Sequence, residues 1–145
     1  MTKWKQALNA AVSGNVLPHM MPPHIHFLSL PPITAWQDNS ISIEWQASED
    51  VYQGGGMVFG GYLSALADYA AGTAMLTTIA DDNVFATHKL EIDYKKPVKA
   101  GMVLITATVI HIADKFVDVE VRFENQQGQL CAIAAVHQTV LAATA

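Results

Sequence analysis

One carboxylate stands out because it is the only formally charged side chain between Asp50 and Asp81. Asp68 lies in a run of small and apolar residues, 62–72, where neither packing nor helix propensity favours an acid. A carboxylate in such surroundings can serve as a general base or as a nucleophile. The alternative is a structural acid that bonds a neighbouring hydroxyl or amide. We favour the catalytic interpretation of Asp68.

Glycines directly precede this segment. Three lie at 54–56, and Gly60 and Gly61 open a stretch that is predicted to be helical. Glycine lets the backbone take unusual torsions and lets a ligand come close. A helix that begins near Gly60 presents unpaired N–H groups at its positive end, and these can stabilise a developing oxyanion. Because each residue adds about 1.5 Å, Asp68 is expected about two turns further along the same helix.

Composition indicates one domain of 145 residues, 1–145, whose 51% hydrophobic residues can build a substantial core. The formal net charge of −5 argues against broad nonspecific binding of nucleic acid. The single cysteine, Cys131, excludes an intramolecular disulfide and fits a reducing compartment, so we expect the cytoplasm. The first residues lack the apolar core of a secretory signal, and no stretch is apolar enough to span a membrane.

Hydrophobic periodicity predicts an α+β domain in which one long central helix is wrapped by an antiparallel sheet of five to six strands. Residues 3–13 are predicted to form a short amphipathic helix, and prolines then predict an irregular wrapping segment up to residue 39. Short turns between the later strands imply antiparallel hairpins. The central helix is expected over residues 60–79, and the strands over residues 41–47, 84–96, 102–112, 116–124 and 129–141.

Alternating residue types assign faces to two of these strands. In the strand 116–124 one face is predicted to be apolar, and it consists of Val117, Val119, Val121 and Phe123. In the strand 84–96 the same parity groups Phe85, Thr87, Lys89 and Glu91. Thr87 is therefore either a plain strand threonine or a polar group of the site, and the sequence leaves both open.

The order of a strand, a glycine turn, an apolar helix with one acid and four antiparallel strands resembles the hotdog fold. The local sequence resembles acyl-CoA thioesterases of the phenylacetate-degradation (PaaI-like) branch. That family has an Asn, a His-Gly-Gly turn, a helical acid, a Ser or Thr at the start of a strand and an Arg-Pro-like turn. The matching positions here are Gln53, Phe59-Gly60-Gly61, Asp68, Thr87 and Lys96-Pro97. The resemblance covers residues 40–141.

The resemblance implies hydrolysis of an acyl-CoA thioester to a free acid and CoA, without a metal or another cofactor. In that scheme Gly60 N–H stabilises the oxyanion, and Asp68 activates water or attacks the thioester directly. Thr87 orients the water, and Gln53 bonds through its amide. In the family the turn and the acid come from different subunits, so we expect a homodimer or a dimer of dimers, which is a homotetramer.

Substrate contacts are expected from residues around the glycine turn and from lysines. Phe59, Gly61 and Tyr62 are candidates for the acyl pocket, although the two aromatic residues fit a core or a dimer interface equally well. A lysine cluster is expected to hold the phosphates of CoA, although a solvated sheet surface explains each member alone. The predicted members of this binding set are Lys89, Lys95 and Lys96.

A second function class stays open beside the enzyme. A non-catalytic hotdog protein that binds or senses acyl-CoA is favoured by Phe59, which replaces the family histidine and can neither hydrogen-bond nor titrate. Asp68 favours the enzyme, because a binding protein gains nothing from an isolated acid. No metal site is expected, since no Cys or acid completes one with His24 and His26. We expect neither nucleic acid nor membrane as a partner, and the sequence does not specify the acyl group.

Overall fold

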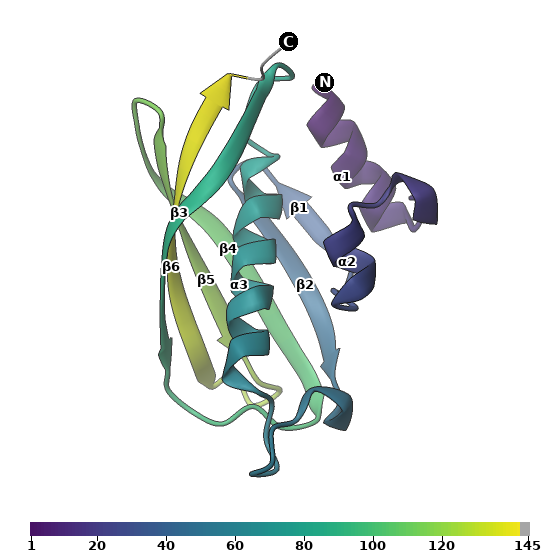
Figure 1. Ribbon diagram of the computed structural model, residues 1–145, viewed down its shortest axis with the longest axis vertical. Helices are drawn as coiled ribbons and strands as arrows, with labels where there is room; N and C mark the ends of the chain where they lie inside the picture. Colours follow the sequence, from purple (N-terminus) through teal and green to yellow (C-terminus); the bar gives the residue numbers. More distant parts are fainter. Residues whose placement is uncertain (143–145) are drawn as a thin grey trace.

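The computed structural model describes residues 1–142, except for the side chain of Pro18. A six-stranded antiparallel sheet curls around one long helix, α3 (Figure 1). The strands lie in the order β1-β2-β4-β5-β6-β3 across the sheet. The predicted α+β hotdog fold with five to six antiparallel strands is confirmed. The strands are β1 (Ala35–Gln37), β2 (Ser40–Ala47), β3 (Asn83–Tyr94), β4 (Gly101–Ala113), β5 (Phe116–Glu124) and β6 (Leu130–Ala142).

Helix α3, Gly60–Met75, is the centre of the core. Alanine has the highest helix propensity, and its single methyl lets the sheet approach closely. The fully buried alanines of the helix are Ala67, Ala70, Ala71 and Ala74. The helix ends four residues before the predicted end at residue 79. Its last turn is closed by Thr77, whose hydroxyl donates to the carbonyl of Ala74 at 2.8 Å, a bond that competes with continued helix.

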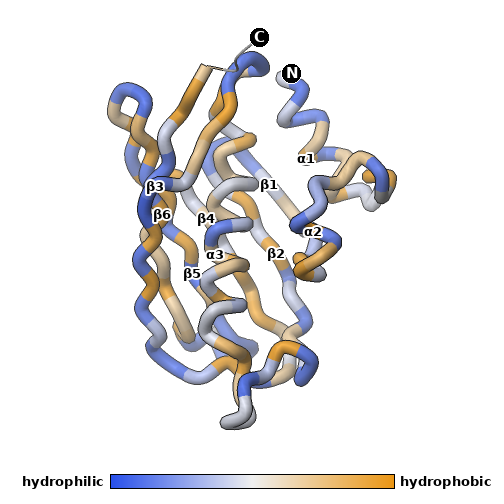
Figure 2. The backbone as a smooth tube through the Cα atoms, in the orientation of Figure 1, coloured by the Kyte–Doolittle hydropathy of each residue, from blue (hydrophilic) through white to orange (hydrophobic). Residues whose placement is uncertain are grey.

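The later strands lie within two residues of their predicted positions. Strand β5 alternates as expected, and the four residues of its inner face, Val117, Val119, Val121 and Phe123, are buried. Figure 2 shows hydrophobic and hydrophilic residues alternating along the strands of the sheet. Strand β1 was not predicted, because its three residues are too few for a periodic signal.

The first 34 residues form a segment that packs beside β2 and α3 (Figure 1). Its helix α1, Lys3–Ser13, agrees with the prediction of a helix over 3–13. A 3-10 turn, Pro18–Met20, and a short helix α2, Pro23–Phe27, follow. The expectation of an irregular segment is thus wrong for α2. Pro23 occupies the first helical position, where a missing N–H costs nothing and the fixed φ suits a helix.

The domain boundaries remain a prediction, and residues 143–145 of the expected domain lie outside the described residues. A short 3-10 helix, Glu49–Val51, leads from β2 to the glycine turn. Within residues 1–142, no helix is both long and apolar enough to cross a membrane.

Candidate active site

Asp68 lies in the middle of α3 on the side that faces β3. The hydroxyl of Thr87 donates a hydrogen bond to Asp68 Oδ1 at 2.7 Å, so the two predicted residues meet across the helix–strand contact. In the single chain the Asp68 side chain is exposed rather than enclosed by apolar groups. The carboxylate is therefore not buried in the single chain, although it lines a cleft with apolar residues. The second oxygen of Asp68 is available for a ligand or a water molecule.

The hydroxyl of Thr87 also contacts the side-chain amide of Gln138, a fully buried residue of β6. Thr87 Oγ1 lies 3.0 Å from Gln138 Oε1, while Gln138 Nε2 has no partner among the described residues. A threonine hydroxyl has one proton, and that proton is already directed at Asp68. Exchanging the amide O and N of Gln138 makes Nε2 a donor to Thr87 Oγ1 and leaves the hydroxyl proton on Asp68. This arrangement fixes the hydroxyl in one orientation.

Strand β3 changes its inward face at His88. The register with β6 shifts between Thr87 and Lys89, so His88 is the extra residue of a β-bulge. Thr87 faces α3, whereas after the bulge Leu90 packs against the core and the odd-numbered residues face outward. The prediction that Thr87 shares a face with Lys89 and Glu91 is wrong. Lys89 instead pairs with Glu91 at 2.8 Å on the exposed side of the sheet, away from the Thr87 hydroxyl.

The first turn of α3 begins with two glycines that lie close to aromatic rings. A Cβ on Gly60 would lie 3.2 Å from the ring of Tyr94, and a Cβ on Gly61 would lie 2.6 Å from the ring of Phe59. Tyr94 Oη donates to the carbonyl of Gly60 at 2.7 Å. The helix starts after Phe59, which provides no side-chain cap. The N–H groups of the first turn therefore point to the open end of the helix, where an anion is stabilised.

Gln53 and Phe59 lie in the loop that leads to this turn. The side-chain oxygen of Gln53 accepts from the N–H of Gly55, and its backbone N–H donates to Met57 at 2.8 Å. Gln53 thus shapes the loop, and its amide nitrogen is the part that remains for a ligand. Phe59 is 57% exposed, so its ring lies at the surface beside Gly61 rather than in the core.

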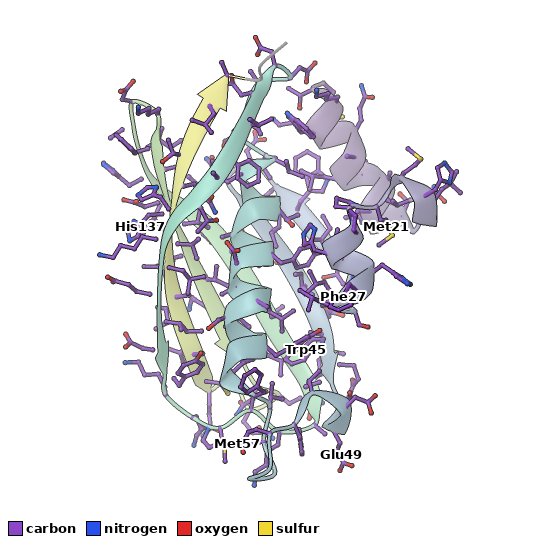
Figure 3. The ribbon with its side chains drawn as sticks, in the orientation of Figure 1. Met21, Phe27, Trp45, Glu49, Met57 and His137 are labelled. Carbon is purple, nitrogen blue, oxygen red and sulfur yellow. The ribbon has the colours of Figure 1, made fainter. Side chains whose placement is uncertain are left out.

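Tyr62 contacts the N-terminal segment, and its predicted contact with an acyl group stays a prediction. Its hydroxyl donates to the carbonyls of Leu28 at 2.9 Å and Ser29 at 3.2 Å, and its ring lies 5.8 Å from that of Trp45. Figure 3 shows Trp45 between β2 and α3. Burial raises the pKa of the Tyr62 hydroxyl, which keeps it a donor. Tyr62 therefore connects α3 to the N-terminal segment.

A cleft of about 760 Å³ opens beside Asp68 and Thr87. One wall consists of α3 and the start of β3, and the other consists of the N-terminal segment. Sequence reasoning missed this second wall, because its residues carry no motif. It also missed Tyr94 and Gln138, which act through contacts between strands and helix that no local pattern reports.

The predicted residues therefore form two groups. Asp68 and Thr87 lie at the cleft, whereas Gln53, the glycines and Phe59 lie at the start of α3. Gly60 and Asp68 are eight residues apart on one helix, so about 12 Å separates them along the axis. Lys95 and Lys96 are exposed just after β3, and their N–H groups bond the carbonyl of Cys131. Among residues 1–142, no three His, Cys, Asp or Glu side chains are grouped to hold a metal ion.

The model of the thioesterase superfamily matches residues 55–132, which is more than half of the chain and includes Asp68, Thr87, Phe59, Gly60 and Gly61. The protein belongs to the thioesterase superfamily. The predicted resemblance to hotdog thioesterases is thereby confirmed, and the family supports thioester hydrolysis as the general reaction. None of the curated proteins compared with the chain matches it.

Solved structures share the fold at low sequence identity. A putative thioesterase from Ralstonia eutropha, described as phenylacetic acid degradation-related, is 21% identical with a TM-score of 0.76, over 91% of this chain and 98% of that one. A thioesterase from Haemophilus influenzae is 19% identical with a TM-score of 0.74, over 81% and 82%. A Streptococcus mutans protein bound to acetyl CoA is 23% identical with a TM-score of 0.68, over 78% and 90%.

Proposed function

We propose that this protein hydrolyses acyl-CoA thioesters to the free acid and CoA. The observation that supports this most directly is the pair of Asp68 and Thr87 at the mouth of the cleft, with one carboxylate oxygen held by the hydroxyl. A held carboxylate has a defined direction, so its second oxygen can act on one position of a bound substrate.

The chemistry needs a polarised carbonyl, an attacking oxygen and a leaving thiolate. As a general base, Asp68 takes a proton from a water molecule while the water oxygen forms a bond to the thioester carbon. The N–H of Gly60 stabilises the negative charge on the carbonyl oxygen. The C–S bond then breaks, and the thiolate of CoA leaves and takes up a proton. Attack by Asp68 itself, through an anhydride that water cleaves, is the second route for the same geometry.

A complete site requires two chains. About 12 Å along one helix is too far for Gly60 and Asp68 of the same chain to act on one carbonyl group. Strand β3 provides a way to join two chains, because it is a 12-residue strand at the edge of the sheet over the described residues. A long unpaired edge is a template for pairing with a second copy. We propose a homodimer in which Gly60 of one chain faces Asp68 of the other, alone or doubled into a homotetramer.

The CoA part of the substrate is assigned to the exposed lysines after β3. Lys95 and Lys96 follow Tyr94, whose hydroxyl contacts Gly60, so they lie at the same end of the molecule as the oxyanion donor. The S. mutans structure that shares this fold is bound to acetyl CoA, which supports CoA as the carrier. Lys89 is a weaker candidate because Glu91 already neutralises it. The buried free thiol of Cys131 fits a reducing compartment, and we assign the reaction to the cytoplasm.

Acyl-CoA binding without turnover is the alternative function. It is favoured by Phe59, an exposed ring at the helix start that can neither donate nor accept a proton. It is also favoured by Gln53, whose amide oxygen is occupied within its own loop.

A screen over acyl-CoA substrates, with thiol release as the signal and equilibrium binding measured in parallel, separates the two functions. If the protein is a hydrolase, it should turn over at least one acyl-CoA, and the rate of thiol release should increase in proportion to the enzyme concentration. Tight binding of acyl-CoA without thiol release across aromatic, short and long acyl groups would make the binding protein the correct assignment.

A further inference from the structure

The cleft beside Asp68 has two walls of different origin. The inner wall belongs to α3 and β3, which lie within the segment matched by the family model, 55–132. The outer wall belongs to the N-terminal segment, which lies outside that match. Its lining residues are mostly apolar and include Trp4, Pro22, Ile25, Leu28 and Leu30. A thioesterase core thus shares its cleft with a wall that the family pattern does not include.

This outer wall is fixed in place by tyrosines of α3. Tyr62 donates to the carbonyls of Leu28 and Ser29, and Tyr69 donates to the carbonyl of Pro31 at 2.8 Å. At the other end of the segment, the indole N–H of Trp4 donates to the carbonyl of Ala80 at 3.0 Å. Three side chains thus bond main-chain carbonyls between the wall and the rest of the domain, so the width of the cleft is set by the fold.

The polar groups that line the cleft are mostly used within the protein. The hydroxyls of Tyr69 and Thr73 both donate to main-chain carbonyls, and that of Thr87 donates to Asp68. No Lys or Arg lines the cleft among the described residues, and His24 is exposed. A charged group deep in this cleft would lose its hydration without gaining a partner. An apolar group would bury its surface against Ile25, Leu76 and Phe85.

We propose that the N-terminal segment forms the acyl-selecting wall of this enzyme, and that the cleft accepts neutral, apolar acyl groups whose length the wall limits. This inference rests on the proposed function for the identity of the thioester. A cleft of about 760 Å³ is within the usual size of sites for small ligands. With the thioester carbon at Asp68, the acyl group extends between α3 and the wall.

Leu28 provides the sharpest test. It lines the cleft at the end of α2, and it is 37% exposed, so neither a larger nor a smaller side chain there disturbs the buried core. Its neighbour Phe27 is 85% exposed and does not line the cleft, which makes Phe27→Trp a matched control (Figure 3). Leu28→Trp narrows the cleft and Leu28→Ala widens it.

The measurement is kcat/KM over straight-chain substrates from acetyl-CoA to palmitoyl-CoA. We expect Leu28→Trp to lower kcat/KM for long chains about 10-fold or more relative to acetyl-CoA, because a hydrophobic pocket discriminates by that factor per methylene-sized change. Leu28→Ala should shift the preference toward longer chains, and Phe27→Trp should leave the profile unchanged. An equal change at every chain length, or the same shift in the Phe27 variant, would overturn the proposal.

A second arm tests the neutral character of the acyl group. Succinyl-CoA ends in a carboxylate, whereas butyryl-CoA of the same length ends in a methyl. We expect kcat/KM for succinyl-CoA to be lower than that for butyryl-CoA by about 10-fold or more, because an ionised group is expensive to bury without a partner. Equal values for the two substrates would make the apolar class wrong.

S-alkyl-CoA thioethers, which cannot be hydrolysed, separate this inference from the proposed function. The wild type could hydrolyse no acyl-CoA but bind the thioethers with an affinity that depends on chain length and on Leu28. In that case the proposal of hydrolysis is wrong, and the proposal of an acyl-selecting wall is correct. If the wild type hydrolyses acyl-CoA and Leu28 has no influence on chain length, hydrolysis is correct and the wall is wrong. If the wild type neither hydrolyses an acyl-CoA nor binds a thioether, both are wrong.

Discussion

The first turn and the middle of α3 offer a substrate different chemical groups. The first turn has main-chain N–H donors and two glycines that keep side chains away from them. The middle has a carboxylate, the hydroxyl that holds it and the buried amide behind that hydroxyl. One region can stabilise negative charge and the other can create a nucleophile, yet neither contains both functions. In the proposed homodimer, the separation along the helix lets each chain contribute half of two sites.

The largest effect is expected at the carboxylate. Asp68→Asn keeps the shape of the side chain and removes the base, so thiol release should fall by roughly 10²-fold or more. The fold should survive, because the amide fills the same space and still accepts the hydroxyl of Thr87. Asp93→Asn, on the exposed side of β3, is the matched control and should keep full activity. Hydrolysis by Asp68→Asn at the wild-type rate would exclude a catalytic role for this residue.

At the first turn, Gly60→Pro should lower the activity nearly as much as Asp68→Asn, for a different reason. Proline removes the N–H donor, yet position 60 is the first of the helix, where proline is well accepted, and Phe59 already has the extended ψ of 127° that precedes proline. Loss of one oxyanion donor should lower kcat by about 10²–10³-fold.

Gly60→Ala is the control for this variant. Its methyl meets the same Tyr94 ring at 3.2 Å but keeps the N–H, so it should retain most of the activity. Equal losses in the two variants would show that crowding against Tyr94, rather than the donor, explains the effect.

A smaller effect is expected from the hydroxyl that orients the acid. Thr87→Val preserves the shape and removes the bond to Asp68, which should lower kcat roughly 10-fold, as expected for one hydrogen bond to a charged group. Thr87→Ser keeps the hydroxyl and should stay close to wild type. Measured kcat values that rank the serine variant with the valine variant would indicate that the methyl group, not the hydroxyl, matters at this position.

The smallest effect concerns the outer wall and appears in stability rather than in rate. Burial raises the pKa of Tyr69 from 10.0 to about 12, so the folded state holds the neutral phenol more strongly than the unfolded chain does. This stabilisation is complete below pH 10 and is lost as the pH rises toward 12, by up to roughly 2–3 kcal/mol.

Urea unfolding of the wild type and of Tyr69→Phe checks this sign. The variant lacks the phenol, so the part of the alkaline loss due to Tyr69 should be absent from it. At neutral pH it should be less stable by about 1 kcal/mol, because the carbonyl of Pro31 loses its donor. Tyr52→Phe leaves Tyr69 in place and should keep the alkaline slope. If the free energy of unfolding had the same pH dependence in wild type and Tyr69→Phe, the alkaline loss of stability could not be attributed to Tyr69.

The periodic parts of the sequence were sufficient to predict every strand of the sheet except β1. Alternation located four long strands to within two residues. The isolated charge indicated Asp68, whereas Thr87 came from the resemblance to hotdog thioesterases, and the two side chains meet in the structure. Faces were predicted less well, because the bulge at His88 is one residue that shifts the parity of the remainder of β3. No residue type announces such a bulge, so Lys89 was grouped with Thr87 although it faces outward.

Contacts between distant segments could not be predicted from the sequence, for a different reason. The partner carbonyls of Tyr62 and Tyr69 are main-chain groups, which are present at every residue and therefore leave no signal. Gln138 reads as an ordinary residue of an alternating strand, and only packing places it under Thr87. The outer wall of the cleft was missed because prolines indicate where a chain turns but not what it then contacts.

The most direct test of the central claim mixes two inactive variants. Asp68→Asn has an intact first turn, and Gly60→Pro has an intact carboxylate. If each site takes its donor from one chain and its acid from the other, a dimer of one copy of each variant has one complete site and one with both defects. Random exchange of subunits should then restore about a quarter of the wild-type activity. Activity that stays at the sum of the two variants, in a mixture proven to contain mixed dimers, would contradict a site built from two chains.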